Sequence, residues 1–179
     1  GTDPDCDRVG VVVKNKEDEY IVLNGNQIGS LLVNYVITNK IDSIDLSKNP
    51  TIVKTIVTSQ LGAEIAKSYG INCLETLTGF KFIGEKIAEF EKTNEHTFVM
   101  GYEESYGYLI GTHARDKDGV VSSLLISEMA AYYYSKGMSL YEGLLEIYKK
   151  YGYYKESLKS ITLKGIDGTN KIKNIMRYF

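Results

Sequence analysis

Runs of β-branched residues alternate with amphipathic segments between residues 51 and 100, and this alternation constrains the fold more than any other feature of the sequence. A β-branched run occupies residues 51–57, and the capped helical pattern that follows it ends at Gly70. A second strand is predicted over residues 71–77, and Thr78-Gly79 begins the next helix. Parallel strands need crossover connections, which are usually helices. Repeated strand–helix units therefore predict an α/β fold with a mainly parallel mixed sheet and helices on both faces, a three-layer α/β/α arrangement.

The residues before this alternation predict a hairpin followed by a helix. Apolar strands are expected over residues 9–14 and 19–23, and the polar segment 15–18 between them suggests a tight turn. Asn24-Gly25-Asn26 then offers an N-cap to a helix that should end near residues 38–40.

A polar segment at residues 41–50 carries a proline and lacks clean periodicity, so we place a domain boundary there. This boundary divides the chain into residues 1–45, residues 46–155 and a linker over residues 156–179. The elements expected after residue 96 are strands at 97–100, 106–110 and 160–164, and helices at 119–135, 139–151 and 169–178.

Composition excludes several classes of partner. The chain has 179 residues and a net charge of −2, with acidic and basic residues interspersed, so we expect neither nucleic-acid binding nor a polybasic membrane surface. The longest apolar stretches are far shorter than a membrane span. Two cysteines, Cys6 and Cys73, do not form a disulfide scaffold in a chain of this length, so we expect a reducing, cytoplasmic location.

An acidic run near the N-terminus carries the strongest chemical signal. Asp3, Asp5 and Asp7 alternate with other residues directly before Arg8 and an apolar strand. Three carboxylates this close repel one another unless a cation lies between them, and Mg²⁺ prefers oxygen ligands. Because the guanidinium of Arg8 suits phosphate oxygens, the run suggests phosphoryl-transfer chemistry.

Other interpretations of the acidic run are possible. An EF-hand loop that began at Asp3 would need Gly where Arg8 stands and Glu where Lys14 stands, so we reject it. Phosphatases with an aspartyl nucleophile carry their D-x-D motif after a buried strand, and no strand precedes this one. A solvated acidic turn stays open, because Asp and Pro are common in turns.

Three further loops follow predicted strands, where ligands gather in open α/β sheets: residues 77–81, 101–107 and 114–119. Thr78-Gly79 exposes backbone N–H groups that can hold an anion, although an ordinary helix cap explains it equally. Glu103 and Ser105 offer a carboxylate and a hydroxyl that suit the vicinal hydroxyls of a sugar, the alternative being an acidic turn. The third loop alternates bases and acids, and it either contacts a substrate or forms weak local ion pairs.

Four segments together resemble the α-D-phosphohexomutase superfamily, specifically its phosphoglucomutases and phosphomannomutases. They read TDPDCDRVG at 2–10, TLTGFKFIG at 76–84, GYEESYGYLIG at 101–111 and ARDKDGV at 114–120. The segments occur in the family's order over most of the chain, which is far more specific than any one motif. The resemblance implies a fold of the phosphoglucomutase central-domain type.

The resemblance also implies roles for individual residues. Asp3, Asp5 and Asp7 would bind Mg²⁺, and Arg8 would lie near a phosphorylated serine and take part in catalysis. The resemblance further assigns the sugar site and a catalytic lysine. Glu103 and Ser105 would hold the ring hydroxyls of the substrate, Thr78 and Gly79 would line the sugar site, and Lys117 would contact the substrate and take part in proton transfer.

Two parts of the family's pattern are missing from the sequence. The phosphoserine loop and the C-terminal phosphate-binding loop do not occur, so we expect a fragment that covers the end of domain 2 and domain 3, without domains 1 and 4. The resemblance implies that the full-length enzyme interconverts hexose 1-phosphate and hexose 6-phosphate, with glucose 1,6-bisphosphate as an activator. We expect the fragment alone to be inactive. A stand-alone sugar-phosphate-binding module and a Mg²⁺-dependent sugar-phosphate phosphatase are the alternatives.

Overall fold

The computed structural model describes residues 1–40, 43–157 and 159–178. The first two residues of the expected boundary segment, 41 and 42, therefore lie outside the described residues. In chain order the elements are β1 (Val11–Lys14), β2 (Tyr20–Leu23), α1 (Gly25–Lys40), the 3-10 helix η2 (Leu46–Lys48), β3 (Pro50–Thr55), α2 (Leu61–Ser68), β4 (Asn72–Thr76), α3 (Phe80–Thr93), β5 (Thr97–Glu103), β6 (Gly107–Ile110), α4 (Gly119–Ser135), α5 (Leu140–Tyr151) and α6 (Gly165–Ile175).

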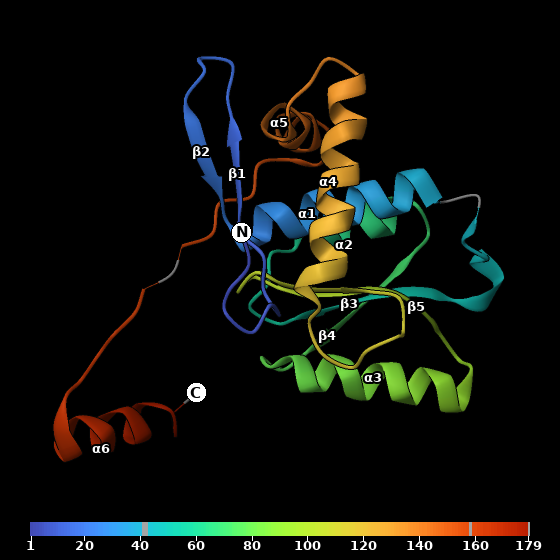
Figure 1. Ribbon diagram of the computed structural model, residues 1–179. Coiled ribbons are helices and arrows are strands. Elements are labelled where there is room, and N and C mark those ends of the chain that lie inside the picture. The colour runs from blue at the N-terminus through green and yellow to red at the C-terminus, as the bar shows by residue number, and fades with distance from the viewer. Residues whose placement is uncertain (41–42, 158, 179) are drawn as a thin grey trace.

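A four-stranded mixed sheet in the order β4-β3-β5-β6 forms the centre of the fold. Strand β3 runs parallel to both β4 and β5, and β6 runs antiparallel to β5. Helix α3 covers one face of this sheet, and helices α1 and α2 lie on the other face (Figure 1). The predicted three-layer fold with a mainly parallel sheet is therefore confirmed.

Strand β3 lies between two hydrophobic cores, which explains its β-branched composition. All six of its residues are buried. Ile52 faces the core formed with helices α1, α2, α4 and α5, whereas Val53 faces the smaller core under α3. A strand that is buried on both faces has no polar side, so its sequence lacks the alternation of a half-exposed strand.

The N-terminal hairpin adds a separate two-stranded sheet to the first core. Strands β1 and β2 are antiparallel, with Val12 opposite Val22 and Val13 opposite Ile21. The side chains of Val11, Val13 and Ile21 pack against the first core, whereas Val12 and Val22 are exposed. The predicted hairpin is confirmed, as is the helix that follows it.

Several element predictions were wrong in their bounds or their existence. Strand β3 ends at Thr55, because Ile56 and Val57 are exposed in the turn toward α2. Strand β5 extends to Glu103, three residues beyond the strand expected at 97–100. The described residues between 159 and 164 form no strand, because they have no neighbouring strand with which to pair.

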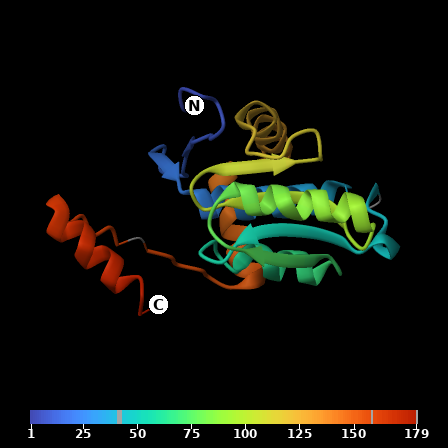
Figure 2. The same cartoon turned by 90° about the horizontal axis from the view of Figure 1, so that it is seen from below.

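Helix α6 starts at Gly165, four residues before the basic helix that the sequence predicted. An extended segment leads to it from α5, and the helix stands away from the sheet in both views (Figures 1 and 2). The expected role of residues 156–179 as a linker stays a prediction. Among the described residues, no helix has the length and hydrophobicity needed to cross a membrane.

Tyr102 fixes the distance between the sheet and the two helices above it. This β5 residue is fully buried, and it contacts the chain where α1 has Gly29 and α2 has Gly62. A Cβ atom at Gly62 would overlap the hydroxyl of Tyr102, and one at Gly29 would lie 2.5 Å from its ring. That hydroxyl has no hydrogen-bond partner among the described residues. The aromatic ring therefore acts as a spacer that only glycines accommodate.

We predict that Gly62→Ala destabilises the chain by about 1–3 kcal/mol, because overpacking at the Tyr102 hydroxyl outweighs the better helix propensity of alanine. Tyr102→Phe removes a buried unpaired hydroxyl and should leave stability unchanged or higher. In the double variant the cost of Gly62→Ala should fall, as measured by urea unfolding. Gly10→Ala is the control, since its nearest new contact would be at 3.9 Å. If Gly62→Ala lowered the free energy of unfolding equally in the presence and in the absence of the Tyr102 hydroxyl, the spacer role would be contradicted.

Candidate functional site

The carboxyl ends of β3, β4 and β5 meet at one edge of the sheet, because these strands are parallel. The turn after β4 carries Thr78-Gly79, and Glu103 is the last residue of β5, so both lie at this edge as predicted. The loop at residues 114–119 follows β6, whose carboxyl end lies at the opposite edge. That loop returns along α3, where Arg115 pairs with Glu91 at 2.5 Å. It therefore comes to the site by a route that the sequence analysis did not foresee.

The acidic run forms a compact loop in front of this edge. Carboxylate oxygens of Asp3, Asp5 and Asp7 all lie within 4.8 Å of one another. Cys6 turns the chain with a φ of 59°, and its N–H donates to the carbonyl of Asp3 at 3.0 Å. The backbone N–H of Arg8 donates to Asp3 Oδ1 at 3.0 Å and holds the pKa of Asp3 below its usual value. The loop thus gathers three carboxyl groups around one point.

The environment of Asp7 fits a bound cation. Its Oδ1 atom is buried and accepts no hydrogen bond from the described residues. Its other oxygen, Oδ2, lies 3.1 Å from Lys117 Nζ. A buried carboxylate oxygen without a partner is costly, and a hard divalent cation is the partner that three clustered carboxylates favour. The residues present therefore suit a magnesium ion.

Lys117 lies at the centre of the candidate site. Its side chain is 11% exposed, and its Nζ lies 3.1 Å from Asp7 and 3.0 Å from Asp116. Partial burial lowers the pKa of Lys117, but the hydrogen bonds to Asp116 and Asp7 outweigh this effect and raise the pKa above its usual value. The Nζ also lies 5.6 Å from the ring centroid of Phe80, the first residue of α3. Lys117 is therefore an ammonium ion that connects the acidic loop with the turn before α3.

Backbone contacts join the acidic loop to the hairpin turn between β5 and β6. Arg8 forms an isolated antiparallel bridge with Gly107, and the N–H of Val9 donates to the carbonyl of Tyr106 at 3.2 Å. The N–H of Gly119 donates to the carbonyl of Cys6 at 3.0 Å. The acidic loop and the residue after it are thus hydrogen-bonded to the turn that contains Ser105 and to the first residue of α4.

Glu103 is buried, and its carboxylate binds the turn before α3. Only 4% of the residue is exposed, and Oε1 accepts a hydrogen bond from the backbone N–H of Gly79 at 2.9 Å. Ser105 is partly exposed and Thr78 is exposed. The structure therefore brings the glutamate loop and the Thr78-Gly79 turn together, as their predicted common role requires.

Arg8 remains at the surface of the site. Its side chain is 48% exposed, and its nearest guanidinium nitrogen lies 3.6 Å from Asp3 Oδ2. This loose pair leaves the guanidinium able to reorient toward a phosphate, because an exposed ion pair of this kind is worth little.

A buried lysine at the same edge escaped the sequence analysis. Lys54 in β3 is fully buried, and its Nζ donates to Glu75 Oε1 at 2.8 Å and to the Thr58 carbonyl at 3.0 Å. Hydrogen bonds from Lys54 and Gln60 lower the pKa of Glu75. The signal available in the sequence was a lysine inside an otherwise uncharged strand. A buried strand tolerates such a charge only where a hydrogen-bonding or oppositely charged partner lies beside it.

Glu104 is a second residue that the sequence analysis passed over. Its Oε2 atom accepts hydrogen bonds from the hydroxyls of Thr55 at 3.2 Å and Thr58 at 3.0 Å. Its carbonyl lies where a Cβ at Gly25 would stand, so α1 begins directly against this turn. Glu104 therefore anchors the turn that carries Glu103 and Ser105 to the end of β3.

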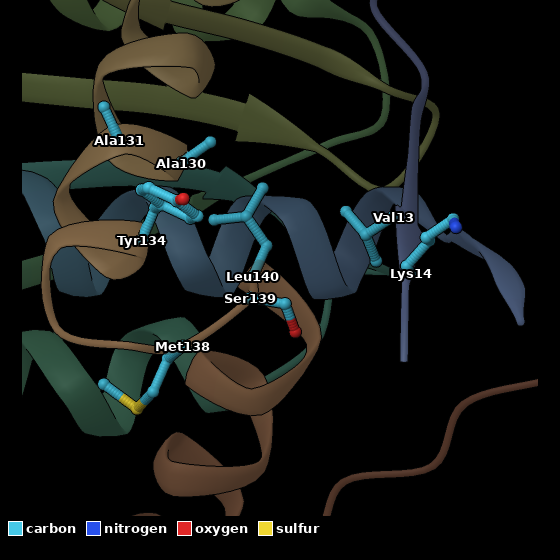
Figure 3. Close-up of a pocket in the computed structure, with 8 residues that line it drawn as sticks. All are labelled: Val13, Lys14, Ala130, Ala131, Tyr134, Met138, Ser139 and Leu140. Atoms are coloured by element: carbon cyan, nitrogen blue, oxygen red, sulfur yellow. The ribbon is translucent and has the colours of Figure 1, made fainter. Parts of the chain in front are cut away.

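An apolar hollow of about 430 Å³ lies away from this edge, between β1, the second half of α4 and the start of α5 (Figure 3). Its polar lining comprises Lys14, Ser139 and the hydroxyl of Tyr134 beside alanine, valine, leucine and methionine side chains. The lining of this hollow contains no carboxylate and no residue of the candidate site. The hollow is therefore separate from the candidate site.

The fold and the site together define an α/β/α domain with a cluster of three carboxylates near the carboxyl ends of its parallel strands, and comparison with known proteins supplies the family. The family model for the phosphoglucomutase/phosphomannomutase alpha/beta/alpha domain III matches residues 24–151. The chain therefore belongs to the phosphoglucomutase/phosphomannomutase family. The expected division at residues 45 and 46 stays a prediction, although α1 shares its core with the sheet.

Curated relatives match almost the whole chain. A phosphoglucomutase of Staphylococcus epidermidis is 38% identical over 179 residues, which are 100% of this chain and 32% of the relative. A phosphoglucomutase of Staphylococcus aureus is 35% identical over 178 residues, or 99% of this chain and 31% of the relative. The chain thus spans about a third of the length of these relatives.

Solved structures agree with this assignment. A putative phosphomannomutase from Thermus thermophilus superposes with a TM-score of 0.66 at 27% identity, covering 84% of this chain and 30% of that one. A phosphoglucomutase from Paramecium has a TM-score of 0.62 at 20% identity, covering 85% and 24%, and supports the fold alone.

We predict that the Lys54–Glu75 pair makes stability depend on pH. The pKa of Glu75 is lower in the folded chain than in the unfolded chain. The pair's contribution to the free energy of unfolding is therefore complete above the unfolded-state pKa of about 4.3. It is lost as the pH falls through the lower pKa that Glu75 has in the folded chain. Glu75→Gln should destabilise the chain at pH 7. Between pH 3 and 5, the urea-unfolding midpoint of this variant should change less with pH than that of the unchanged chain.

Glu89→Gln is the matched control for this experiment, because Glu89 forms an exposed pair with Lys86 that should contribute little. If both variants showed the same acid profile as the unchanged chain, the Lys54–Glu75 pair would have no such role.

Proposed function

We propose that this chain provides the metal loop and the sugar-binding domain of a Mg²⁺-dependent phosphohexomutase that interconverts hexose 1-phosphate and hexose 6-phosphate. The observation that supports this most strongly is the contact of Lys117 with Asp7 at 3.1 Å, since it joins the loops that bear the metal ligands and the catalytic lysine. Lys117 further joins Phe80, beside the Gly79 turn that binds Glu103.

The acidic loop has the properties required of a metal site. Asp3, Asp5 and Asp7 would hold the magnesium ion, through oxygens that already lie within 4.8 Å of one another. A divalent cation in this position would offset the negative charge of a phosphoryl group during transfer. Arg8, on the exposed side of the loop, would contact that group's oxygens.

The sugar-binding role rests on Glu103 and Ser105. The carboxylate of Glu103 is oriented by the Gly79 N–H, so it can accept hydrogen bonds from ring hydroxyls without losing its position. Ser105 both donates and accepts, which suits a substrate that must bind in two opposite orientations. Lys117, as an ammonium ion, would donate a hydrogen bond or a proton to a sugar or phosphate oxygen.

We propose a cytoplasmic enzyme that takes glucose or mannose phosphates and is activated by glucose 1,6-bisphosphate. Assays of the intact protein with glucose 1-phosphate, mannose 1-phosphate and ribose 1-phosphate in parallel test the substrate class. Release of inorganic phosphate in place of hexose 6-phosphate would favour a phosphatase. Binding without turnover by the intact protein would favour a non-catalytic module.

We predict that Lys117→Met in the intact protein lowers kcat at least about 100-fold, because it removes the charge and the proton that act on the substrate. Lys14→Met is the control, since Lys14 forms an exposed pair with Asp18 in the N-terminal hairpin. A coupled assay for hexose 6-phosphate measures both variants, and the chain of residues 1–179 alone should give no turnover. An unchanged kcat in Lys117→Met would remove the lysine from the reaction.

We predict that the chain alone binds Mg²⁺ more weakly than 1 µM, because ordering a loop next to the N-terminus costs conformational entropy. Asp7→Asn should abolish binding, since it weakens the ligand whose Oδ1 has no other partner among the described residues. Asp18→Asn, in an exposed hairpin turn, should leave it unchanged. Calorimetric titration with Mg²⁺ provides the measurement, and submicromolar affinity or equal binding by both variants would contradict the proposal.

A further inference from the structure

A second cavity, of about 230 Å³, lies at the other end of the helices that begin beside the candidate site. Its lining comes from the second half of α1, the residue after α2, the end of α4 and much of α5. Helix α4 starts at Gly119, two residues after Lys117, and first lines the cavity at Tyr132, 13 residues later, which corresponds to about 20 Å at 1.5 Å per residue. The cavity is therefore distinct from the metal loop and the sugar turn.

Aromatic side chains form the walls of this cavity, which we call the tyrosine cavity. The tyrosines that line it are Tyr69, Tyr132, Tyr133 and Tyr151. Such side chains present a flat apolar face to a ring and a hydroxyl to a polar group. The Tyr133 hydroxyl accepts a hydrogen bond from Asn34 Nδ2 at 3.4 Å, and that of Tyr151 lies 3.1 Å from Ser68 Oγ.

Two lysines reach into the same space and bind the tyrosines instead of carboxylates. Lys136 Nζ donates to the Tyr132 hydroxyl and lies 4.0 Å from the centroid of its ring. Lys150 Nζ donates to the Tyr69 hydroxyl at 3.3 Å and lies 4.8 Å from the centroid of the Tyr151 ring. The hydroxyls of Tyr151 and Tyr69 accept hydrogen bonds from Lys150 and raise its pKa, so it is an ammonium ion at neutral pH.

The local charge balance leaves these two cations without counter-ions. Glu146 is the one carboxylate among the lining residues, and it pairs with Lys149 at 2.6 Å. Neither Lys136 nor Lys150 forms an ion pair with a carboxylate in the part of the chain that the structure describes. Two ammonium groups beside phenol hydroxyls and an amide provide hydrogen-bond donors for an anion.

From this arrangement we propose that the tyrosine cavity binds a small phosphomonoester that carries a single ring. The phosphate lies between Lys136 and Lys150 and replaces the tyrosine hydroxyls as their partner, and the ring packs against the tyrosine faces. The cavity is smaller than the 300–1,000 Å³ typical of larger ligands, which limits the ligand to about one ring and one phosphate. This site is independent of the proposed mutase chemistry.

Titrations of the isotopically labelled chain, followed by NMR, test the proposal with inorganic phosphate, phenyl phosphate and glucose 6-phosphate as probes. We expect saturable shifts at residues lining the tyrosine cavity with one or both ring-bearing esters, and weaker binding of inorganic phosphate. Tighter binding of phenyl phosphate would indicate an aromatic ring, and tighter binding of glucose 6-phosphate would indicate a sugar. Equal affinity for all three probes, or shifts that do not saturate, would overturn the proposal.

Substitutions of neighbouring lysines supply the specificity control. Lys136→Met and Lys150→Met should each weaken ester binding about tenfold or more, since each removes a charge-assisted hydrogen bond. Lys67→Met removes an exposed lysine in the last turn of α2, outside the cavity lining, and should leave binding unchanged. Lys117→Met should also leave these shifts unchanged, which separates this site from the candidate mutase site. A loss as large in Lys67→Met as in Lys150→Met would indicate adventitious surface charge and would overturn the proposal.

Discussion

The candidate site depends on backbone pairing between a loop at the N-terminus and a sheet edge a hundred residues away in sequence. The N–H of Val9 donates to Tyr106 and the N–H of Gly119 donates to Cys6, at 3.2 and 3.0 Å. Cys6 and Tyr106 both have positive φ angles, 59° and 68°, which are unfavourable for residues with a Cβ atom. Such conformations persist where surrounding contacts fix them. Here the backbone carbonyl of each of these two residues accepts one of the hydrogen bonds named above.

Glycines make the close approach of these segments possible. A Cβ atom at Gly119 would lie 2.6 Å from the Cys6 carbonyl oxygen, and one at Gly107 would overlap the side chain of Lys117. Gly25 performs the same role for α1, which starts against the Glu104 carbonyl. The positions of the acidic loop, the lysine and the glutamate turn are therefore set by the backbone. The side chains that bear the chemistry are attached to a rigid frame.

Much of the fold followed from residue patterns, because strand β3 and its helical crossovers have strong local signals. The antiparallel direction of β6 did not, since strand direction depends on pairing and not on composition. The buried Lys54 was missed because its partner Glu75 comes from the neighbouring strand. For the site, the acidic triplet and the glutamate at the end of β5 could be predicted from the sequence. The contact of Asp7 with Lys117 could not, because it depends on the loop after β6 returning along α3. The predicted strand at 160–164 failed because no neighbouring strand pairs with it among the described residues.

Amide chemical shifts of the labelled chain during a Mg²⁺ titration test most directly whether the metal loop and the sugar turn form one unit. The hydrogen bonds at Val9 and Gly119 predict that Gly107, Gly119 and Ser105 shift with the same midpoint as Asp7, and that Asp7→Asn abolishes all of these shifts together. Shifts confined to residues 3–8 would show that the acidic loop and the sheet edge act separately, and the account of a single site would be wrong.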